Sequence, residues 1–249
     1  TDDGWLRMAD GGRLAQVDVP ESKLPDCPLP LLPEHDDFDA PTLLPYYYAP
    51  RIMPQRFADV TARPGWVRLR GQESQASLHK VSLLARKVTS VHMEFTTCLD
   101  FTPEIYQHSA GLILYYDNMN SIFLRKYYSD TLHHSALGLI RLENGEKDEF
   151  PACRTLAEDK PVYLKLTIDG RQSRFSYGYD GETFTPIGPV FDTTRFSDEY
   201  CKYGEFTGTM AGLLCIDSMK HEHTADFAFF TAAVQSDESP CLAAPAGEK

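Results

Sequence analysis

The chain has few of the features that mark a nucleic-acid-binding, membrane-spanning or zinc-stabilised protein. Among its 249 residues, 24 are Lys or Arg and 36 are Asp or Glu, and the net charge of -12 argues against nucleic acid and anionic membranes as the main partner. No run of about twenty apolar residues occurs, so no conventional membrane-spanning helix is expected. The six cysteines include no Cys-x-x-Cys pair and no Cys/His spacing of a zinc site, which argues against structural zinc.

Signals for helices are equally scarce. No window keeps apolar residues at spacings of three and four, and no internal repeat is present. A short turn with Ser197 as its cap is the strongest helix-like signal. Tryptophan is also rare, with 2 residues against 13 tyrosines, whose rings suit strands and packing and can also stack on sugars.

The compartment stays open. Because the cysteines are widely scattered, free and partly buried thiols are at least as well supported as a disulfide framework. The first residues, Thr-Asp-Asp-Gly-Trp, contain neither an initiator methionine nor a signal-peptide pattern. We expect a soluble piece of a longer protein, either cytoplasmic or secreted.

A period of two dominates the centre of the chain. Apolar residues alternate with polar ones over 91–101 and 162–168, which predicts strands with one buried face. Two apolar runs, 112–116 and 122–128, flank a polar turn at 117–120. Strands at intervals of roughly 8–12 residues indicate an antiparallel β-sandwich. Further tight turns are predicted at Asn144-Gly145, Asp169-Gly170 and Asp180-Gly181.

Composition divides the chain into three parts. Residues 1–34 combine a short apolar segment, Gly4-Trp5-Leu6, with the start of a proline-rich connector. Residues 35–235 carry the strand pattern, and residues 236–249 are expected to be a weakly held tail. Each connector proline removes a hydrogen-bond donor and fixes φ; these prolines are Pro20, Pro25, Pro28, Pro30, Pro33, Pro41, Pro45 and Pro50.

Residues 99–116 are the most informative stretch. They read Leu-Asp-Phe-Thr-Pro-Glu-Ile-Tyr-Gln-His-Ser-Ala-Gly-Leu-Ile-Leu-Tyr-Tyr, a Pro-Glu turn followed by an Ala-Gly-Leu strand that ends in tyrosines. This order of residues resembles the C-terminal β-sandwich of family 43 glycoside hydrolases, the β-xylosidase and α-arabinofuranosidase group. Residues 63–74, 83–87 and 225–227 are similar to further pieces of that domain, in the same order.

The resemblance implies a concanavalin A-like antiparallel β-sandwich of jelly-roll type, preceded by a Pro-rich connector and a short remnant of a β-propeller. It also implies an enzyme that removes terminal xylose from xylo-oligosaccharides with inversion. In that family the catalytic carboxylates belong to an N-terminal five-bladed propeller, so the propeller is the expected partner, in the same chain or a separate one. Catalytic residues are therefore expected to be absent from this chain, and homo-oligomerisation stays open.

The resemblance also points to one loop. The segment Tyr203-Gly204-Glu205-Phe206-Thr207-Gly208 has two glycines that allow it to project. In related β-xylosidases such a loop helps to close the substrate pocket, which implies that Phe206 forms an apolar wall. Glu205 replaces an aromatic residue of the family pattern, so either Phe206 forms the wall alone, or the pocket edge is more polar and the sugar preference shifts. The alternative is an ordinary hairpin with Phe206 in the core.

Metal sites receive little support from the sequence. Acidic residues of the first and last strands, Asp37 and Asp226, are candidate calcium ligands, although solvated surface acids explain them better and no cofactor is required. His133-His134 and His221-Glu222-His223 do not predict a metal site, because no third ligand is near them and the second run is expected to form a turn.

Two other functions compete with the accessory domain. A standalone carbohydrate-binding module could use a sheet face lined by tyrosines, but it would have no use for the segment around Trp5 or a stiff proline-rich lead. An independent enzyme lacks a candidate acid–base pair, and no Gly-x-Ser-x-Gly elbow is present. The sequence does not decide between xylosidase and arabinofuranosidase activity.

Overall fold

The computed structural model describes residue 25 and residues 32–202 and 208–235. The chain divides into two units, residues 1–32 and residues 33–249. Within the described residues of the second unit, two antiparallel β-sheets form a sandwich, with no α-helix and three short 3₁₀ helices. The 3₁₀ helices are η2 (Pro54–Arg56), η3 (Pro151–Cys153) and η4 (Thr193–Arg195). No described helix combines the length and apolar character that a membrane span requires.

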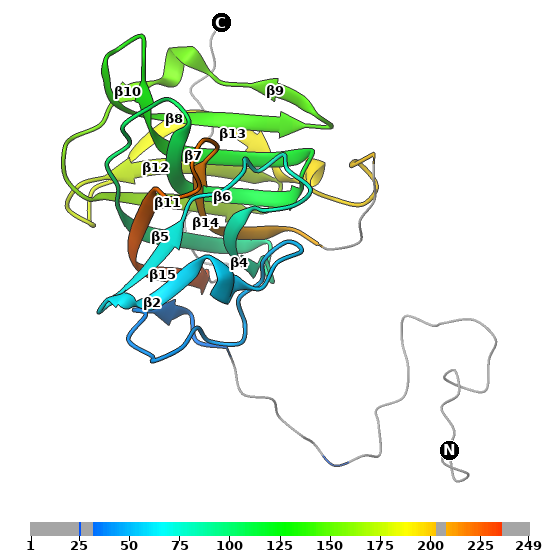
Figure 1. Cartoon of the computed structure of the whole chain (residues 1–249). Helices are drawn as coiled ribbons and strands as arrows, with labels where there is room; N and C mark the ends of the chain where they lie inside the picture. Colours follow the sequence, from blue (N-terminus) through cyan, green and yellow to red (C-terminus); the bar gives the residue numbers. More distant parts are fainter. Residues whose placement is uncertain (1–24, 26–31, 203–207, 236–249) are drawn as a thin grey trace, which may run out of the picture. The chain divides into compact units, whose positions relative to one another are not determined.

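An 8-stranded sheet, here sheet A, has the order β13-β12-β11-β5-β15-β3-β2, with β1 added to β15. Figure 1 shows β15, near the red end of the colour scale, beside the strands from the blue and cyan part of the chain. Its strands are β1 (His35–Asp36), β2 (Ala58–Arg63), β3 (Trp66–Arg70), β5 (His92–Asp100), β11 (Val162–Asp169), β12 (Gln172–Gly178), β13 (Thr185–Asp192) and β15 (Thr224–Val234).

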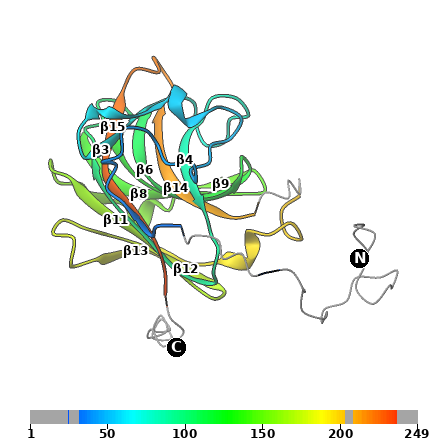
Figure 2. The same ribbon diagram turned by 90° about the horizontal axis from the view of Figure 1, so that it is seen from below.

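A 7-stranded sheet, here sheet B, has the order β10-β8-β7-β6-β14-β4, with β9 added to β8. Figure 2 shows the sandwich from below, with β11, β12 and β13 in a different layer from β4, β6 and β14. The strands are β4 (Ser82–Lys87), β6 (His108–Asp117), β7 (Asn120–Ser129), β8 (His134–Glu143), β9 (Glu146–Asp148), β10 (Thr155–Leu156) and β14 (Met210–Asp217).

Alternate side chains of the strands form the apolar core between the two sheets, as predicted. Every second side chain of β11 is buried, and the first and last of this set are Val162 and Ile168. Leu99, Leu112 and Leu114 are also fully buried in the same cluster. The predicted strands at 112–116 and 122–128 are longer in the structure, where they become β6 and β7.

Two details of the predicted alternation are wrong. The alternation over 91–101 predicts a buried Val91, yet this residue is 62% exposed because it precedes β5 and lies outside the paired strands. Cys98 was placed on the wet face but is buried, since it lies directly opposite the Tyr163 ring in the β5–β11 register. Of the cysteines in the described part of the chain, Cys98, Cys153, Cys201 and Cys215 are free thiols.

The hairpin predictions hold at two of three turns. Asn144 and Gly145 both have positive φ and join β8 to β9 through a two-residue loop, as an Asn-Gly pair favours. Gly170, with φ of 58°, turns β11 into β12. Asp180 lies in a longer connection instead, where its Oδ1 accepts the backbone N–H groups of Glu182 and Thr183.

The middle of sheet B is buried on both faces. A second apolar cluster lies on the side away from sheet A and contains Ile113, Phe123 and Leu214 among its members. Residues 48–51 border part of this side, where they line a hollow together with Leu83, Ala85 and Tyr115. Burial on both faces explains why these strands read as continuous apolar runs.

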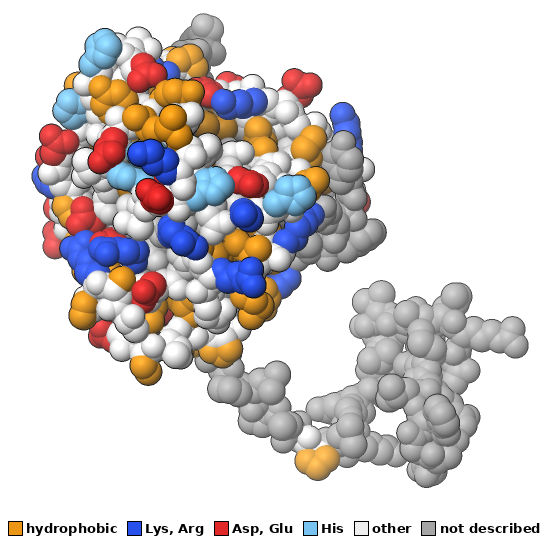
Figure 3. Space-filling model, viewed as in Figure 1, with side chains coloured by type: hydrophobic (Ala, Val, Ile, Leu, Met, Phe, Trp, Pro, Cys, Tyr) orange, Lys and Arg blue, Asp and Glu red, His pale blue; other side chains and the backbone are white. Residues whose placement is uncertain are grey.

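Charge is mixed on the surface that Figure 3 shows. Basic and acidic side chains lie near one another there, with histidines among them and hydrophobic side chains on either side. A face of this kind offers no extended basic track for a phosphate backbone, in agreement with the acidic composition.

We predict that Gly111→Ala destabilises the sandwich by about 1–3 kcal/mol, because a Cβ at this position would overlap the backbone carbonyl of Leu124 on β7. Gly138→Ala is the matched control on the same sheet. There the nearest atom is a side-chain carbon of Tyr127 at 3.3 Å, which can shift, so we expect a smaller loss. Urea denaturation of both variants checks this, and equal stabilities would contradict it.

Candidate functional site

One end of sheet B gathers the residues that hold the loop predicted to be functional. The C-terminal ends of β6 and β8 and the N-terminal end of β14 meet here. Met210 of β14 pairs with Tyr115 near the end of β6, and Ser121 of β7 pairs with Leu142 near the end of β8. Residues 196–202 and 208–209, on either side of the loop, therefore lie at this end of the sheet. Phe206 and Glu205 themselves lie outside the described residues, so their predicted role stays a prediction.

The stem before the loop is tied to two strand ends of sheet B. The Tyr116 hydroxyl, at the end of β6, donates to Asp198. Glu143, the last residue of β8, accepts from the hydroxyl of Tyr200 and from Arg195 Nη1 at 2.5 Å. These three hydrogen bonds join the ends of β6 and β8 to the segment before residue 203, so this segment is held by strands of sheet B.

Backbone contacts complete the attachment on both sides of the loop. Lys202 N donates to Asn144 Oδ1 at 3.0 Å, which links the stem to the β8–β9 turn. On the far side, Gly208 has φ of 73° and Thr209 Oγ1 donates to the carbonyl of Phe196 at 2.8 Å. The two ends of the loop are thus held against the same sheet edge.

Two hollows flank these stems. One, of about 270 Å³, is lined by the aromatic rings of Tyr48, Tyr115 and Tyr116 and by the start of β14. The other, of about 240 Å³, lies beside Glu143 and Arg195. Aromatic and apolar walls with a few polar groups are what sugar rings and protein partners both contact.

The carboxyl groups here do not have the properties of a glycosidase acid. A general acid needs a raised pKa, yet each described carboxyl group whose pKa is displaced has it displaced downward. At Glu143, burial pushes the pKa upward, but Tyr200 and the two neighbouring arginines outweigh it and lower the pKa. Among the described residues at this site, Glu143 therefore lacks the raised pKa of a general acid.

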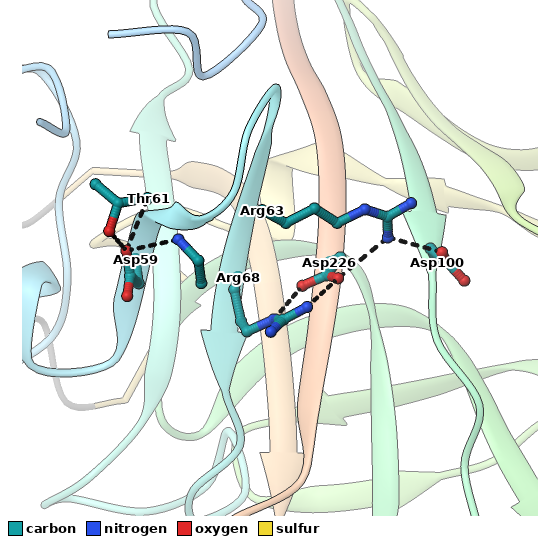
Figure 4. Close-up of polar contacts among 7 residues, drawn as sticks. Asp59, Thr61, Arg63, Arg68, Asp100 and Asp226 are labelled. Atoms are coloured by element: carbon teal, nitrogen blue, oxygen red, sulfur yellow. Dashed lines mark hydrogen bonds and ion pairs between the residues drawn. The ribbon is translucent and has the colours of Figure 1, made fainter. Parts of the chain in front are cut away.

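The two predicted calcium ligands are engaged elsewhere. Both carboxylate oxygens of Asp226 are 2.7 Å from Arg68, and Arg63 adds a contact at 3.1 Å while also reaching Asp100 (Figure 4). Asp37 is exposed and lies 3.3 Å from His35. A carboxylate neutralised by two guanidinium groups is a poor cation ligand, so calcium stays a prediction without support from this geometry.

Sequence reasoning missed the structural role of Asp36. Its buried carboxylate accepts the hydroxyl of Tyr47 at 2.9 Å and the backbone N–H of Phe38 at 2.9 Å. Burial, followed by the charge of Asp36, raises the pKa of Tyr46 to about 12. The first and last described strands lie side by side here, because Asp36 pairs with Phe230 of β15.

The expectation that no third ligand lies near His223 is wrong. Its ring stacks on His108 with centroids 4.0 Å apart, and the side chain of Glu104 is close to both. His221 is in the turn before β15, as predicted, with φ of 59°. Burial, together with the neighbouring His223, lowers the pKa of His108. These residues meet because His108 pairs with Asp217 across β6 and β14, which local sequence patterns do not reveal.

Comparison with known proteins agrees with this architecture. The family described as "Beta xylosidase C-terminal Concanavalin A-like domain" matches residues 35–233. The chain belongs to this family. It is 30% identical over 238 residues to a β-xylosidase of Bacillus subtilis (strain 168), covering 92% of this chain and 43% of that protein. It is 29% identical over 229 residues to a xylan 1,3-β-xylosidase of a Vibrio species, covering 92% of this chain and 42% of that protein.

A solved structure gives the same result. The xylan β-1,4-xylosidase of Bacillus halodurans C-125 superposes with a TM-score of 0.81 at 36% identity, covering 93% of this chain and 45% of that one. The chain thus spans less than half the length of these relatives, and in this β-xylosidase domain family it corresponds to the C-terminal region. The sandwich predicted from the sequence is confirmed.

Two of the matching sequence pieces meet in the β-xylosidase domain. Residues 63–74 form β3 and its flanks, and residues 225–227 begin β15, so Arg68 lies opposite Asp226 across the β3–β15 ladder. The ion pairs of Asp226 therefore join segments that are 158 positions apart. This contact gives a physical reason for both pieces without any catalytic role.

We predict that Asp226→Asn lowers the free energy of unfolding by about 1–3 kcal/mol at neutral pH, because two guanidinium groups lose a negatively charged acceptor. Burial raises the pKa of Asp226, but Arg68 and Arg63 lower it below the ordinary 3.8. The stabilisation is therefore complete above the unfolded pKa and is lost as pH falls through the folded one.

Urea denaturation at several pH values checks this prediction, with Asp37→Asn as the control. Its side chain is 61% exposed, so we expect a change within about 0.5 kcal/mol. The variant at 226 should also lose less stability than the parent chain between neutral and acidic pH. Identical pH profiles for the two variants would contradict the assignment.

Proposed function

We propose that this chain is the C-terminal accessory domain of a family 43 β-xylosidase, which packs on an N-terminal catalytic propeller and helps to close its substrate pocket. The observation that carries the proposal is the family match over residues 35–233 in relatives more than twice as long. The complete enzyme would remove terminal xylose from xylo-oligosaccharides, with the hydrolytic carboxyl groups supplied by the propeller.

The stems of residues 203–208 support a role for this loop. Tyr116, Glu143 and Asn144 hold the segment before the loop, and Thr209 anchors the segment after it. A loop attached at both ends to a sheet edge loses less entropy when it meets a partner than a free loop does. We propose that Phe206 contributes an apolar wall to the pocket and that Glu205 makes its edge more polar.

The first test is reconstitution. This chain and the N-terminal part of the same enzyme should each be inactive alone and should together hydrolyse 4-nitrophenyl β-xyloside. The matching arabinofuranoside, assayed in parallel, measures the preference between the two sugars. Hydrolysis by this chain alone would overturn the assignment, and so would xylan binding by a chain that never associates with the propeller, as in a standalone module.

We predict that Phe206→Ala in the reconstituted enzyme raises KM for the xyloside several-fold and leaves association of the two parts intact, because an apolar wall acts mainly through substrate binding. Tyr106→Ala is the control: this ring is 60% exposed and precedes β6, at the opposite end of sheet B. Equal kinetics for the two variants would remove Phe206 from the pocket.

A further inference from the structure

We propose that Glu104, His108 and His223 form a binding site for a divalent transition-metal ion, with Zn²⁺ as the natural probe. In the described part of the chain, these three residues are the one group of potential ligands that converges: their ligand atoms all lie within 4.8 Å of one another. They border a hollow of about 320 Å³ that also includes Asp217 and Lys220. The hollow gives an ion and its water molecules access to the ligands.

Three separate segments bring these ligands together. Glu104 is in the exposed turn after β5, His108 is the first residue of β6, and His223 immediately precedes β15. The β6–β14 ladder sets the position of His108, and the turn after β14 sets that of His223. The site is thus built on strand ends of both sheets and does not rest on a single flexible loop.

The polar contacts of both imidazoles place Nε2 toward an oxygen atom and leave Nδ1 as the candidate ligand atom. His223 Nε2 is 2.9 Å from the carbonyl oxygen of Thr102, so this nitrogen carries the proton. His108 Nε2 faces Asp217 Oδ1 at 3.5 Å. His223 Nδ1 is then the atom with the free electron pair, and His108 Nδ1 accepts only a long contact from the backbone N–H of Glu104. Metal-binding histidines commonly have this arrangement, in which the second nitrogen donates to a carbonyl or carboxylate oxygen.

Asp217 is held firmly in this supporting position. Its Oδ1 accepts the backbone N–H groups of Met219 and Lys220, and its Oδ2 accepts those of Glu222 and His223. The carboxylate is thus a fixed negative charge behind His108, and the same turn positions His223.

Binding requires a small rearrangement. The two rings are nearly parallel, with an angle of 11° between their planes, so their free electron pairs do not yet converge on one point. Rotation about the Cβ–Cγ bonds would bring them together. His108 Nδ1 would exchange a long contact, 3.4 Å from the backbone nitrogen of Glu104, for the ion.

The ligand set selects the ion. Two imidazoles and one carboxylate suit zinc and neighbouring transition metals, whereas calcium requires six to eight oxygen ligands. Three protein ligands leave one position for water. The site lies at the end of sheet B opposite the 203–208 stems, because His108 and Tyr115 are at opposite ends of the β6–β14 register. It therefore does not depend on the proposed pocket function.

Titration of the full 249-residue chain with ZnCl₂ by calorimetry tests the proposal. We expect one ion per chain, and a rise in melting temperature of about 5 °C or more at a zinc concentration a hundredfold above Kd, reversed by a chelator. Glu104→Gln and His223→Gln should each weaken binding at least about tenfold. The Glu104 side chain is exposed, so its variant should fold normally, and the glutamine at 223 keeps a donor for Thr102.

His134→Ala is the matched control, because it removes an exposed histidine from the adjacent pair His133-His134, the obvious place for adventitious zinc. Its affinity should equal that of the parent chain. The absence of saturable binding would overturn the proposal. Binding that survives both Glu104→Gln and His223→Gln, or that disappears only in His134→Ala, would also overturn it.

Discussion

Burial of the central strands of sheet B on both faces is the constraint on which the domain depends. β4, β6 and β14 carry apolar side chains toward sheet A and also away from it, so both faces of sheet B must be shielded from water. Sheet A shields one face, and residues 48–51 border part of the other, beside Leu83, Ala85 and Tyr115. Burying apolar area stabilises a protein by about 25 cal/mol per Å², which makes the burial of both faces strongly favourable. Within sheet B, the backbone of the neighbouring strand leaves no room for a Cβ at Gly111 or Gly212.

A sheet packed in this way provides firm attachment at both of its ends, and the two ends carry different chemistry. Tyrosine hydroxyls and Glu143 hold the stems of residues 203–208 at one end. Imidazoles and the fixed carboxylate of Asp217 gather at the other. The proposed pocket function and the proposed metal site thus share a scaffold without sharing a residue. A change at one end need not disturb the other.

The sequence predicts individual strands and turns better than it predicts which residues of different strands come into contact. Alternation in β11 and the Asn144-Gly145 turn are local signals, because side-chain direction and turn conformation depend on adjacent residues. The resemblance adds the fold class. By contrast, the contact between His108 and His223 depends on the register of β6 with β14 and on the turn after it, and the partner of Asp226 depends on the β3–β15 ladder. Such registers are fixed by packing over the whole sandwich, so neither site could be read from spacing along the chain.

The position of β15 has a consequence for how the domain folds during synthesis. This strand lies between β3 and β5 and also pairs with β1, yet it is the last of the described strands along the sequence. Sheet A therefore cannot close until residues 224–234 have left the ribosome. Until then β3 and β5 have unpaired edges, which favour association with other chains. Because its decisive pairings are distant in sequence, the sandwich should fold slowly and late, and a nascent chain would benefit from protection of these edges until β15 arrives.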